Sequence, residues 1–529
     1  MWFRSTRLPR RDSSARTPYF RPQVDALEDR CLLSAAGALD TTFGGTGQVT
    51  TSLSKGNDTA NAVLIQPWDG KVVVAGSNGS GMALARYNPN GALDSSFGNA
   101  GTVVSKIGTT WWNAAALYPS TDTSGNAKKI VEAGAGSLAR FNTNGSVDTS
   151  FGSRGLVTVP WAIAGVVILP DGQIVVGGDN GSAFELSRYN ANGTLDTTFG
   201  TRGTATVSVP AGVGANALAL QAYGQLVVAG TYGPGPGAGW ELARLNSNGT
   251  LDSSFGNAGT VTLTFGAGAG PLRGLAIYPG TGTDTADYGK IEVAGTINGN
   301  PVPPGLNSNQ IAVARLNPDG TPDNSFGQSG QVVTPFPNSG GMAWATALQG
   351  DGKVVVAGQT LVGATWVFSL LRYDTNGSPD TSFGNGGLVQ TANGYSRAWG
   401  VAIQADGRIV AAGSTDGNTG WDFMTARYLP GPEIGTFTTS AATVTVGGSL
   451  TLTASNLTDG DPSATVAQVA FYAVDQSGNQ FLLGATLSSG IWTLTTTVGL
   501  PPGSYTLFAQ ATDSSDIVGD SAFLPLTVE

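Results

Sequence analysis

Short runs of hydrophobic and small residues, separated by Gly, Asn, Asp and Pro, fill most of this chain. In the first such stretch the runs cover residues 47–53, 60–70, 71–76 and 82–88. Each run has the length and the apolar or β-branched content of a strand, and the residues between the runs are those that form tight turns. The pattern therefore predicts β-strands joined by hairpins rather than a helical bundle.

This four-run unit repeats along the chain, and one short motif marks the repeats. The motif reads LDTTFG, LDSSFG, VDTSFG, LDTTFG, LDSSFG, PDNSFG and PDTSFG, and its aspartates are Asp40, Asp94, Asp148, Asp196, Asp252, Asp323 and Asp380. A second element, of the type ARYN, contributes Arg86, Arg140, Arg188, Arg244, Arg315, Arg372 and Arg427. Seven units of four antiparallel strands predict an all-β fold with a seven-bladed β-propeller. A solenoid is the alternative, although no capping repeat is visible at either end.

Residue size and motif spacing predict how the blades are built. The run near Ala60 and Ala62 is rich in small residues, so we expect it innermost, where blades converge. The run at 101–105 is then outermost, and residues 47–53 complete the last blade. Six of the arginines precede an aspartate by eight positions, which predicts structural Arg–Asp pairs. Arg427 and Asp40 each lack such a partner, so we predict that they pair with each other and close the ring.

The repeat resembles a known family. Its elements FG-x-x-G-x-V, A-V-x-I-Q-x-D-G-K-x-V-V-A-G and A-R-Y-N-x-N-G-x-L-D are similar to those of the bacterial delta-60 repeats, over residues 37–430. The resemblance implies a repeat propeller in a surface setting and lends no activity.

The two flanking regions resemble segments of exported proteins. Residues 1–36 are Arg-rich and are expected to be disordered. They contain LEDRCLLSA, which resembles the LEPR-XLL motif of planctomycete-type surface and exported proteins. Residues 431–529 contain about seven alternating runs and resemble bacterial Ig-like domains, which implies a β-sandwich that acts as a spacer or adhesion module. Together these resemblances imply an extracellular or cell-surface location.

Composition excludes several functions. The net charge is −10, which argues against nucleic acid as a partner, and no apolar run has transmembrane length. The chain has no His and a single cysteine, Cys31. The commonest general base and metal ligands are thus missing, and we expect no enzymatic activity, no cofactor and no metal. The loop from Arg86 to Asp94 is similar to an FG-GAP calcium loop, but an arginine stands at its first ligand position. The segment from Asp374 to Asp380 is the least poor metal candidate.

Irregular residues between the strands supply candidate binding groups. We expect the loops before each inner strand, and those between the second and third strands, to share one face of the ring. The ligand-binding candidates on this face are Trp111, Trp112, Arg273, Trp344, Arg397 and Trp399. Exposed aromatic residues on a concave face suit a saccharide or peptide. The alternative is that these tryptophans fill the channel or pack between blades.

These observations predict a non-enzymatic, exported or cell-surface binding or scaffold protein, with a cell-surface glycan or protein as its partner. A carbohydrate-active enzyme is one alternative, for which Asp58, Asp179, Asp416 and Asp422 are the available carboxylates. A purely structural component of a surface layer is the other.

Overall fold

The computed structural model describes residues 36–529, apart from 109–113, 210–213, 222–223, 234–236, 266–267, 280–286, 299–308, 337–339, 392–393, 418–419, 460–464, 476–479, 487–490, 514–517 and 522–523. The LEDRCLLSA motif, Trp111 and Trp112 lie outside these residues. The described residues form strands, turns and bends, and no α-helix. Within them, no helix has the length and hydrophobicity needed to cross a membrane.

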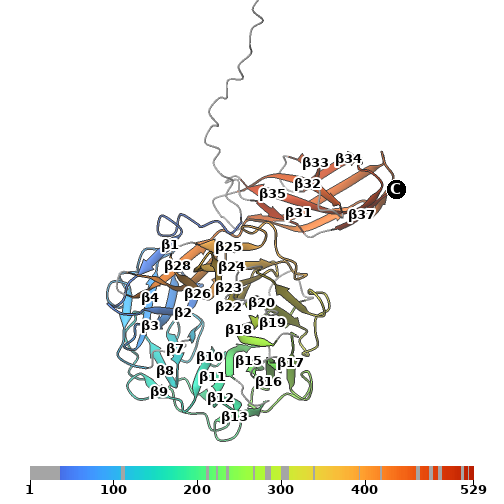
Figure 1. Ribbon diagram of the computed structural model, residues 1–529. Coiled ribbons are helices and arrows are strands. Elements are labelled where there is room, and N and C mark those ends of the chain that lie inside the picture. Colours follow the sequence, from blue (N-terminus) through green and yellow to red (C-terminus); the bar gives the residue numbers. More distant parts are fainter. Residues whose placement is uncertain are drawn as a thin grey trace, which may run out of the picture. The chain divides into compact units, whose positions relative to one another are not determined.

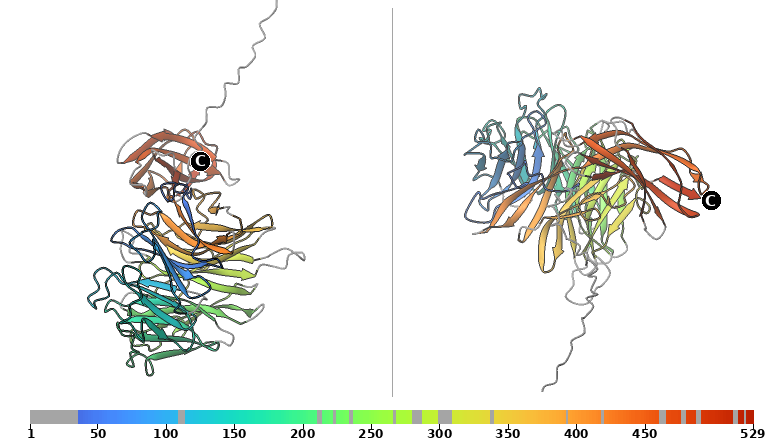
Figure 2. Two further views of the ribbon diagram at one scale, coloured as in Figure 1. Left: turned by 90° about the vertical axis from the view of Figure 1, so that its left-hand side faces the viewer. Right: turned by 90° about the horizontal axis from the view of Figure 1, so that it is seen from above.

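Seven four-stranded antiparallel sheets form the first and larger part of the fold (Figure 1). The first three, which we call blades 1–3, contain β2 (Thr59–Ile65), β3 (Val72–Ser77), β4 (Met82–Tyr87) and β5 (Thr102–Val104); β6 (Ala114–Leu117), β7 (Ile130–Gly134), β8 (Ser137–Phe141) and β9 (Leu156–Thr158); and β10 (Ala162–Ile168), β11 (Ile174–Asp179), β12 (Ala183–Tyr189) and β13 (Thr204–Ser208). Hairpin turns emerge on both faces of the ring (Figure 2).

The remaining blades continue the same order. Blades 4–7 contain β14 (Gly214–Leu220), β15 (Leu226–Tyr232), β16 (Gly239–Leu245) and β17 (Thr260–Leu263); β18 (Ala269–Ile277), β19 (Ile291–Asn298), β20 (Asn309–Leu316) and β21 (Gln331–Thr334); β22 (Gly341–Leu348), β23 (Val354–Val362), β24 (Thr365–Tyr373) and β25 (Leu388–Thr391); and β26 (Ser396–Ile403), β27 (Ile409–Asp416), β28 (Trp421–Tyr428) and β1 (Gln48–Thr51). The predicted seven-bladed β-propeller is confirmed.

The small-residue strand is innermost, as its composition predicts. Each inner strand contacts the inner strand of the next blade, from β2 through β6, β10, β14, β18 and β22 to β26 and back to β2. The approach is close: a Cβ atom on Gly274 would lie 2.9 Å from the backbone nitrogen of Thr346 in the next blade. The inner strands can therefore converge at the axis only because their side chains are small.

Hydrophobic side chains fill the space between neighbouring blades. At the boundary of blades 7 and 1, Val74, Ala85 and Tyr87 pack with Val410 and Phe423, and all five are fully buried. Comparable clusters lie at the other boundaries. Blade-to-blade packing is the main apolar contribution to stability.

The ring closes through its first strand. β1 pairs with β28 in antiparallel register, from Gln48 opposite Ala426 to Thr51 opposite Phe423. Residues 47–53 thus contribute the outer strand of the last blade, as predicted. One boundary differs from expectation: Ala36, which we had placed in the N-terminal segment, is fully buried and bridges to Phe383. Its carbonyl accepts the N–H of Gly384 at 2.7 Å.

Two further sheets follow the propeller. One contains β29 (Pro432–Thr439), β31 (Ser449–Asp459) and β34 (Trp492–Thr497); the other contains β30 (Thr443–Val444), β37 (Leu524–Val528), β35 (Gly503–Asp513), β36 (Val518–Asp520), β32 (Val466–Asp475) and β33 (Gln480–Thr486). Residues of both sheets, among them Leu452, Phe471, Trp492 and Leu507, share one hydrophobic core. This region is an additional β-structure, and its likeness to Ig-like domains stays a prediction.

Candidate functional site

The recurring motif of the repeat builds seven copies of one charged cluster. In every copy the Arg Nε atom lies 2.6–2.8 Å from the Asp Oδ2 atom, in the pairs Arg86–Asp94, Arg140–Asp148, Arg188–Asp196, Arg244–Asp252, Arg315–Asp323, Arg372–Asp380 and Arg427–Asp40. The last pair joins residues from the start and the end of the chain segment that forms the ring, as the spacing predicts. Each guanidinium also lies over the Phe of an FG dipeptide, at 4.4–5.0 Å from its centroid.

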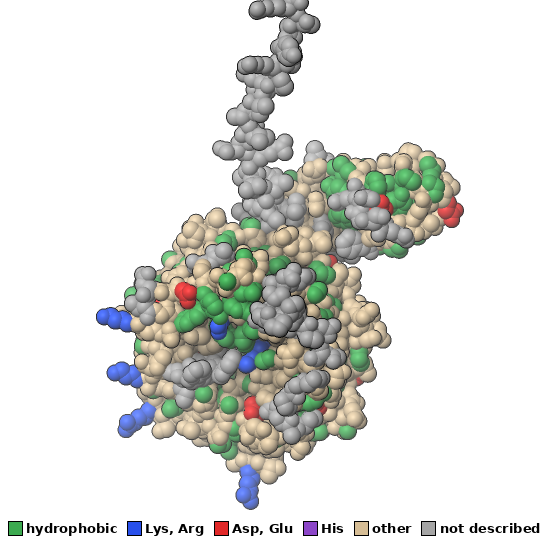
Figure 3. All heavy atoms as spheres, viewed as in Figure 1, with side chains coloured by type: hydrophobic (Ala, Val, Ile, Leu, Met, Phe, Trp, Pro, Cys, Tyr) green, Lys and Arg blue, Asp and Glu red, His purple; other side chains and the backbone are tan. Residues whose placement is uncertain are grey.

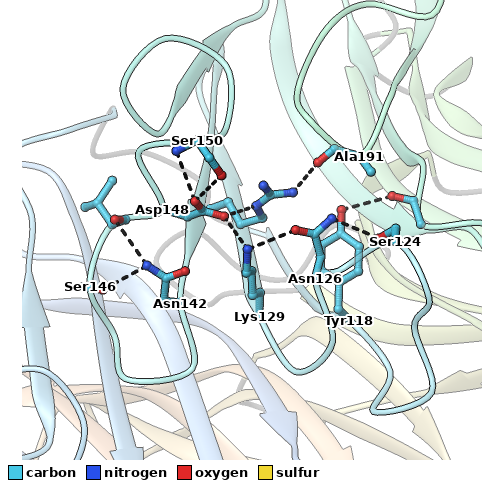
Figure 4. Close-up of polar contacts among 12 residues, drawn as sticks. Tyr118, Ser124, Asn126, Lys129, Asn142, Ser146, Asp148, Ser150 and Ala191 are labelled. Atoms are coloured by element: carbon cyan, nitrogen blue, oxygen red, sulfur yellow. Dashed lines mark hydrogen bonds and ion pairs between the residues drawn. The ribbon is translucent and has the colours of Figure 1, made fainter.

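Blade 2 shows how the cluster works (Figure 4). The Asp148 carboxylate accepts hydrogen bonds from Arg140 Nε at 2.7 Å, from Lys129 Nζ at 2.8 Å, and from Ser150 N and Oγ at 3.1 and 2.6 Å. Arg140 Nη1 also donates to the carbonyl of Ala191, which follows the third strand of blade 3. The arginine therefore joins two blades, while the aspartate holds it and the FG turn in place.

These contacts shift the aspartate pKa values downward. Burial by itself raises the pKa of Asp148, but hydrogen bonds from Lys129 and Ser150 and the charge of Arg140 outweigh it, so the pKa is low. For Asp196, hydrogen bonds from Thr198, assisted by those from Gln173 and Arg188, lower the pKa to about 2 against a smaller effect of burial. Both carboxylates are therefore ionised at neutral pH.

Sequence reasoning missed the second donor of this cluster. Each aspartate also receives a side chain that stands at the start of the second strand, and the seven are Lys71, Lys129, Gln173, Gln225, Lys290, Lys353 and Arg408. The signal was available, because each of these residues directly precedes the Val- or Ile-rich run of its unit. The cluster is a structural device that recurs in every blade, and the copy at Asp40 joins the start of the ring to its last blade.

The loops with calcium-like spacing form turns of their own. In the first loop the Asn90 side chain accepts the N–H of Ala92 at 3.1 Å, which is an Asx turn. Asp374 and Asp380 lie 3.5 and 2.9 Å from Lys353 Nζ, so a cation already stands between them. No group of three or more acidic or cysteine side chains with metal-binding geometry is found among the described residues.

A cavity of about 500 Å³ occupies the centre of the ring. Residues from the inner strands of all seven blades line it, and it extends to Ala135 and Asp179 at the turns between second and third strands. It thus reaches the face on which sequence reasoning placed the irregular loops. Figure 3 shows hydrophobic and basic side chains gathered near the centre of the ring.

Three of the predicted ligand-binding residues lie in this cavity, and a backbone irregularity places them there. The register of β18 shifts between Leu272 and Gly274, that of β22 between Ala343 and Ala345, and that of β26 between Ala398 and Gly400. The residues at these β-bulges are Arg273, Trp344 and Trp399. The same shift occurs in β2, β10 and β14, at Asn61, Ala164 and Asn216. A bulge redirects one side chain, here into the channel.

The bulge residues of blades 5–7 form one contact network. The rings of Trp344 and Trp399 are 4.3 Å apart between centroids, at an angle of 46°. The Arg273 guanidinium lies 5.5 Å from the Trp344 centroid. Arg397, the fourth predicted residue, lies 5.8 Å from the Trp399 centroid and is held by a 2.6 Å hydrogen bond to Tyr395 Oη.

Two aromatic residues of this network were not predicted. Arg397 also lies 5.0 Å from the ring of Tyr395 and 5.4 Å from that of Trp421. We call the set of Arg273, Trp344, Arg397, Trp399, Tyr395 and Trp421 the arginine–aromatic cluster. All six are half-buried. Burial lowers the pKa of Arg273 to about 10, so it remains a cation at neutral pH.

The carboxylates considered for an enzyme do not converge on this cavity. Of Asp58, Asp179, Asp416 and Asp422, all of them described, Asp179 alone borders it. Both Asp179 oxygens accept backbone N–H groups, from Gly181 and Ala215, each at 3.0 Å. Asp58 likewise accepts the N–H groups of Leu53 and Ser54 at 2.7 and 3.0 Å. These two acids stabilise loops.

The sheets, their closure and the central cavity define the chain as a seven-bladed β-propeller repeat protein. Seven segments match the family model described as "Domain of unknown function (DUF5122) beta-propeller", at residues 69–97, 125–151, 169–199, 221–255, 289–326, 349–383 and 404–431. The first six segments each span the second and third strands of one blade and the motif that follows them, and the seventh spans β27 and β28. The match supports a repeat propeller and carries no activity. A comparison with curated proteins gave no match.

Several solved structures are distantly similar. A protein of unknown function from Bacteroides caccae is 12% identical with a TM-score of 0.34, over 61% of this chain and 98% of that chain. BBS1N in complex with ARL6DN is 12% identical with a TM-score of 0.39, over 72% and 95%. The endo-arabinase from Bacteroides thetaiotaomicron is 11% identical with a TM-score of 0.26, over 49% and 92%. Likenesses at this level carry no argument about function.

Proposed function

We propose that this chain is a non-enzymatic, exported or cell-surface binding protein whose propeller binds a saccharide or protein ligand at the mouth of its central channel. The observation that carries the proposal is the arginine–aromatic cluster, of which Arg273, Trp344 and Trp399 stand at bulge positions of the inner strands and line the cavity. Aromatic faces and a cation at the wall of a cavity are the usual means of holding a ligand without reacting with it.

Features outside the cavity support the surface setting. The LEDRCLLSA segment resembles an export-associated motif, and residues 431–529 resemble Ig-like spacer domains of surface proteins. The repeats themselves resemble the delta-60 type. The charged clusters between blades serve stability in every blade alike, so the variable bulge positions are where ligand specificity is encoded.

A carbohydrate-active enzyme is the less supported alternative. It needs two carboxylates that face one substrate across a short distance. Asp179 is the one acid of the four candidates at the cavity, and its oxygens already accept backbone N–H groups. A structural surface-layer component, the other alternative, has no need of a cluster of tryptophans at an open cavity.

Tryptophan fluorescence tests the proposal. The full chain is screened on a glycan array and against cell-surface protein extracts, and each hit is titrated into the wild type and the variants Trp344→Ala and Trp399→Ala. Trp68→Ala is the matched control, because Trp68 is also half-buried and lies 5.3 Å from a cation, Lys128 Nζ, but does not line the cavity.

We expect a ligand-induced fluorescence change that the Trp68 variant retains and the other two lose. Protection of Trp344 and Trp399 from soluble quenchers in the free protein would contradict the proposal, since both would then be packing residues. So would ligand binding that neither cavity substitution weakens.

A further inference from the structure

The six bulge positions that the structure describes follow a chemical order around the channel. In the order of the blades they are Asn216, Arg273, Trp344, Trp399 and Asn61 in blades 4, 5, 6, 7 and 1, with Ala164 opposite, in blade 3. All six border the cavity. One side of the channel wall therefore carries a cation and two aromatic rings between two amides, whereas the side at blade 3 carries a methyl group.

The charge at this wall is positive. Arg273 is the cation among the lining residues, and Asp179 is the acid among them. Because both Asp179 oxygens accept backbone N–H groups, that carboxylate is engaged in its own loop. The guanidinium of Arg273 stands beside the Trp344 ring at 5.5 Å and keeps its charge at neutral pH. An anionic group of a ligand next to an aromatic face is the complement of this pair.

The size and walls of the cavity limit the ligand. A volume of about 500 Å³ admits a small ligand or the end of a chain, and excludes a folded partner. Asn61 offers an amide group on one side of the arginine and the aromatic pair. Asn216, whose side-chain NH2 donates to the Gly214 carbonyl at 2.8 Å, offers its amide oxygen on the other side, where it can accept a hydrogen bond from a hydroxyl group.

On these grounds, and resting on the function proposed above, we propose that the ligand is an acidic saccharide. A uronic acid unit joins a carboxylate to a ring with an apolar C–H face, so that Arg273 pairs with the carboxylate while Trp344 or Trp399 packs against the ring. Arg397, held by Tyr395 Oη and flanked by Trp421, positions Trp399 and does not touch the carboxylate.

Matched probes separate charge from shape. Digalacturonate and its methyl ester share ring, linkage and hydroxyl pattern and differ in charge, and each is titrated by calorimetry into the full-length chain. We expect the acid to bind and the ester to bind roughly tenfold more weakly, because esterification removes the charge-assisted hydrogen bonds that Arg273 donates. Arg273→Gln should remove this difference. Arg273→Lys should retain part of it, since lysine keeps the charge without the bidentate geometry.

The control variant is Arg202→Gln, which removes an exposed arginine that does not line the cavity. It should bind the acid as the wild type does, and circular dichroism verifies that all variants are folded. Equal affinity for acid and ester, sensitive to Trp344→Ala, overturns the acidic-saccharide inference and leaves the proposed binding site standing. The inference also fails if the acid binds independently of Arg273, or if only peptides with a free carboxyl end compete at Trp344.

Discussion

At the scale of single residues, the chain uses buried charge for construction. Seven aspartates lie within 3 Å of an arginine. Each also accepts a hydrogen bond from a second side chain and from the N–H of the Ser or Thr two positions later. The Arg–Asp pairs could be predicted from their spacing of eight residues, because the motif recurs in fixed register. The pairing has a direct consequence for pH dependence.

We expect the propeller to lose stability as the pH falls from about 4 towards 2. Asp196 has a pKa of about 2 in the folded state, lowered from 3.8. A lowered carboxyl pKa contributes stability that is present above 3.8 and is lost as the pH falls through the folded value. Urea unfolding of wild type and Asp196→Asn at a series of pH values should show the two midpoints converging over this range. A separation between the two midpoints that stays constant from pH 4 to pH 2 would contradict the assignment.

A second residue has the opposite pH dependence. Glu292 in β19 is fully buried, and burial raises its pKa well above the usual 4.5, despite the charge of Arg315 and a 3.4 Å hydrogen bond with Tyr278 Oη. A raised carboxyl pKa means that stability is retained below 4.5 and is lost as the pH rises towards the folded value. Glu292→Gln should therefore be more stable than wild type at pH 7, by a margin that grows as the pH rises above 4.5. If the difference in unfolding free energy between Glu292→Gln and wild type were the same at pH 4.5 and at pH 7, this prediction would be refuted.

At the scale of elements, side-chain size predicts the order of the strands within a blade. It does not predict that the side chains of Trp344 and Trp399 point into the channel. Small residues identify the inner strand, because only they allow blades to converge. A strand with strict alternation would send Trp344 and Trp399 to the same face as their second neighbours. The bulges at these residues break the alternation, and no residue pattern in the sequence marks them. Tyr395 and Trp421 escaped prediction because they join the cluster only through Arg397.

The contact between neighbouring blades can be tested in one side chain. Arg140 of blade 2 bonds both to Asp148 in its own blade and to the carbonyl of Ala191 in blade 3. Lysine would keep the charge but cannot span both acceptors in this geometry. We expect Arg140→Lys to lower the unfolding free energy by about 1–3 kcal/mol, the cost of leaving a buried polar group unsatisfied. Arg154→Lys, at an exposed position of the same blade, should be close to neutral, and an equal loss in both variants would argue against the blade contact.

At the scale of the whole molecule, the ring is closed by pairing its first strand with its last blade. Closure removes two free sheet edges that an open array would expose. The seam is held by the β1–β28 ladder, by Asp40 with Arg427 and Arg408, and by Arg427 Nη1 donating to the carbonyl of Pro89 at 2.5 Å. The other six copies of the cluster lie within continuous chain, so that loss of one leaves its two blades covalently joined.

Asp40→Ala and Asp94→Ala therefore form a matched pair of variants. Each removes one aspartate from a cluster in which a buried arginine is left without its carboxylate, which costs roughly 3–5 kcal/mol. In Asp94→Ala the neighbouring blades stay covalently joined, whereas in Asp40→Ala the start of the ring is held to the last blade by the remaining non-covalent contacts of the seam alone. We expect hydrogen exchange to accelerate at the β1 and β28 amides in Asp40→Ala alone, while the core around Leu452 and Trp492 keeps its protection in both. If the β1 and β28 amides exchanged at the same rate in both variants, Asp40 would have no greater part in closing the ring than Asp94 has.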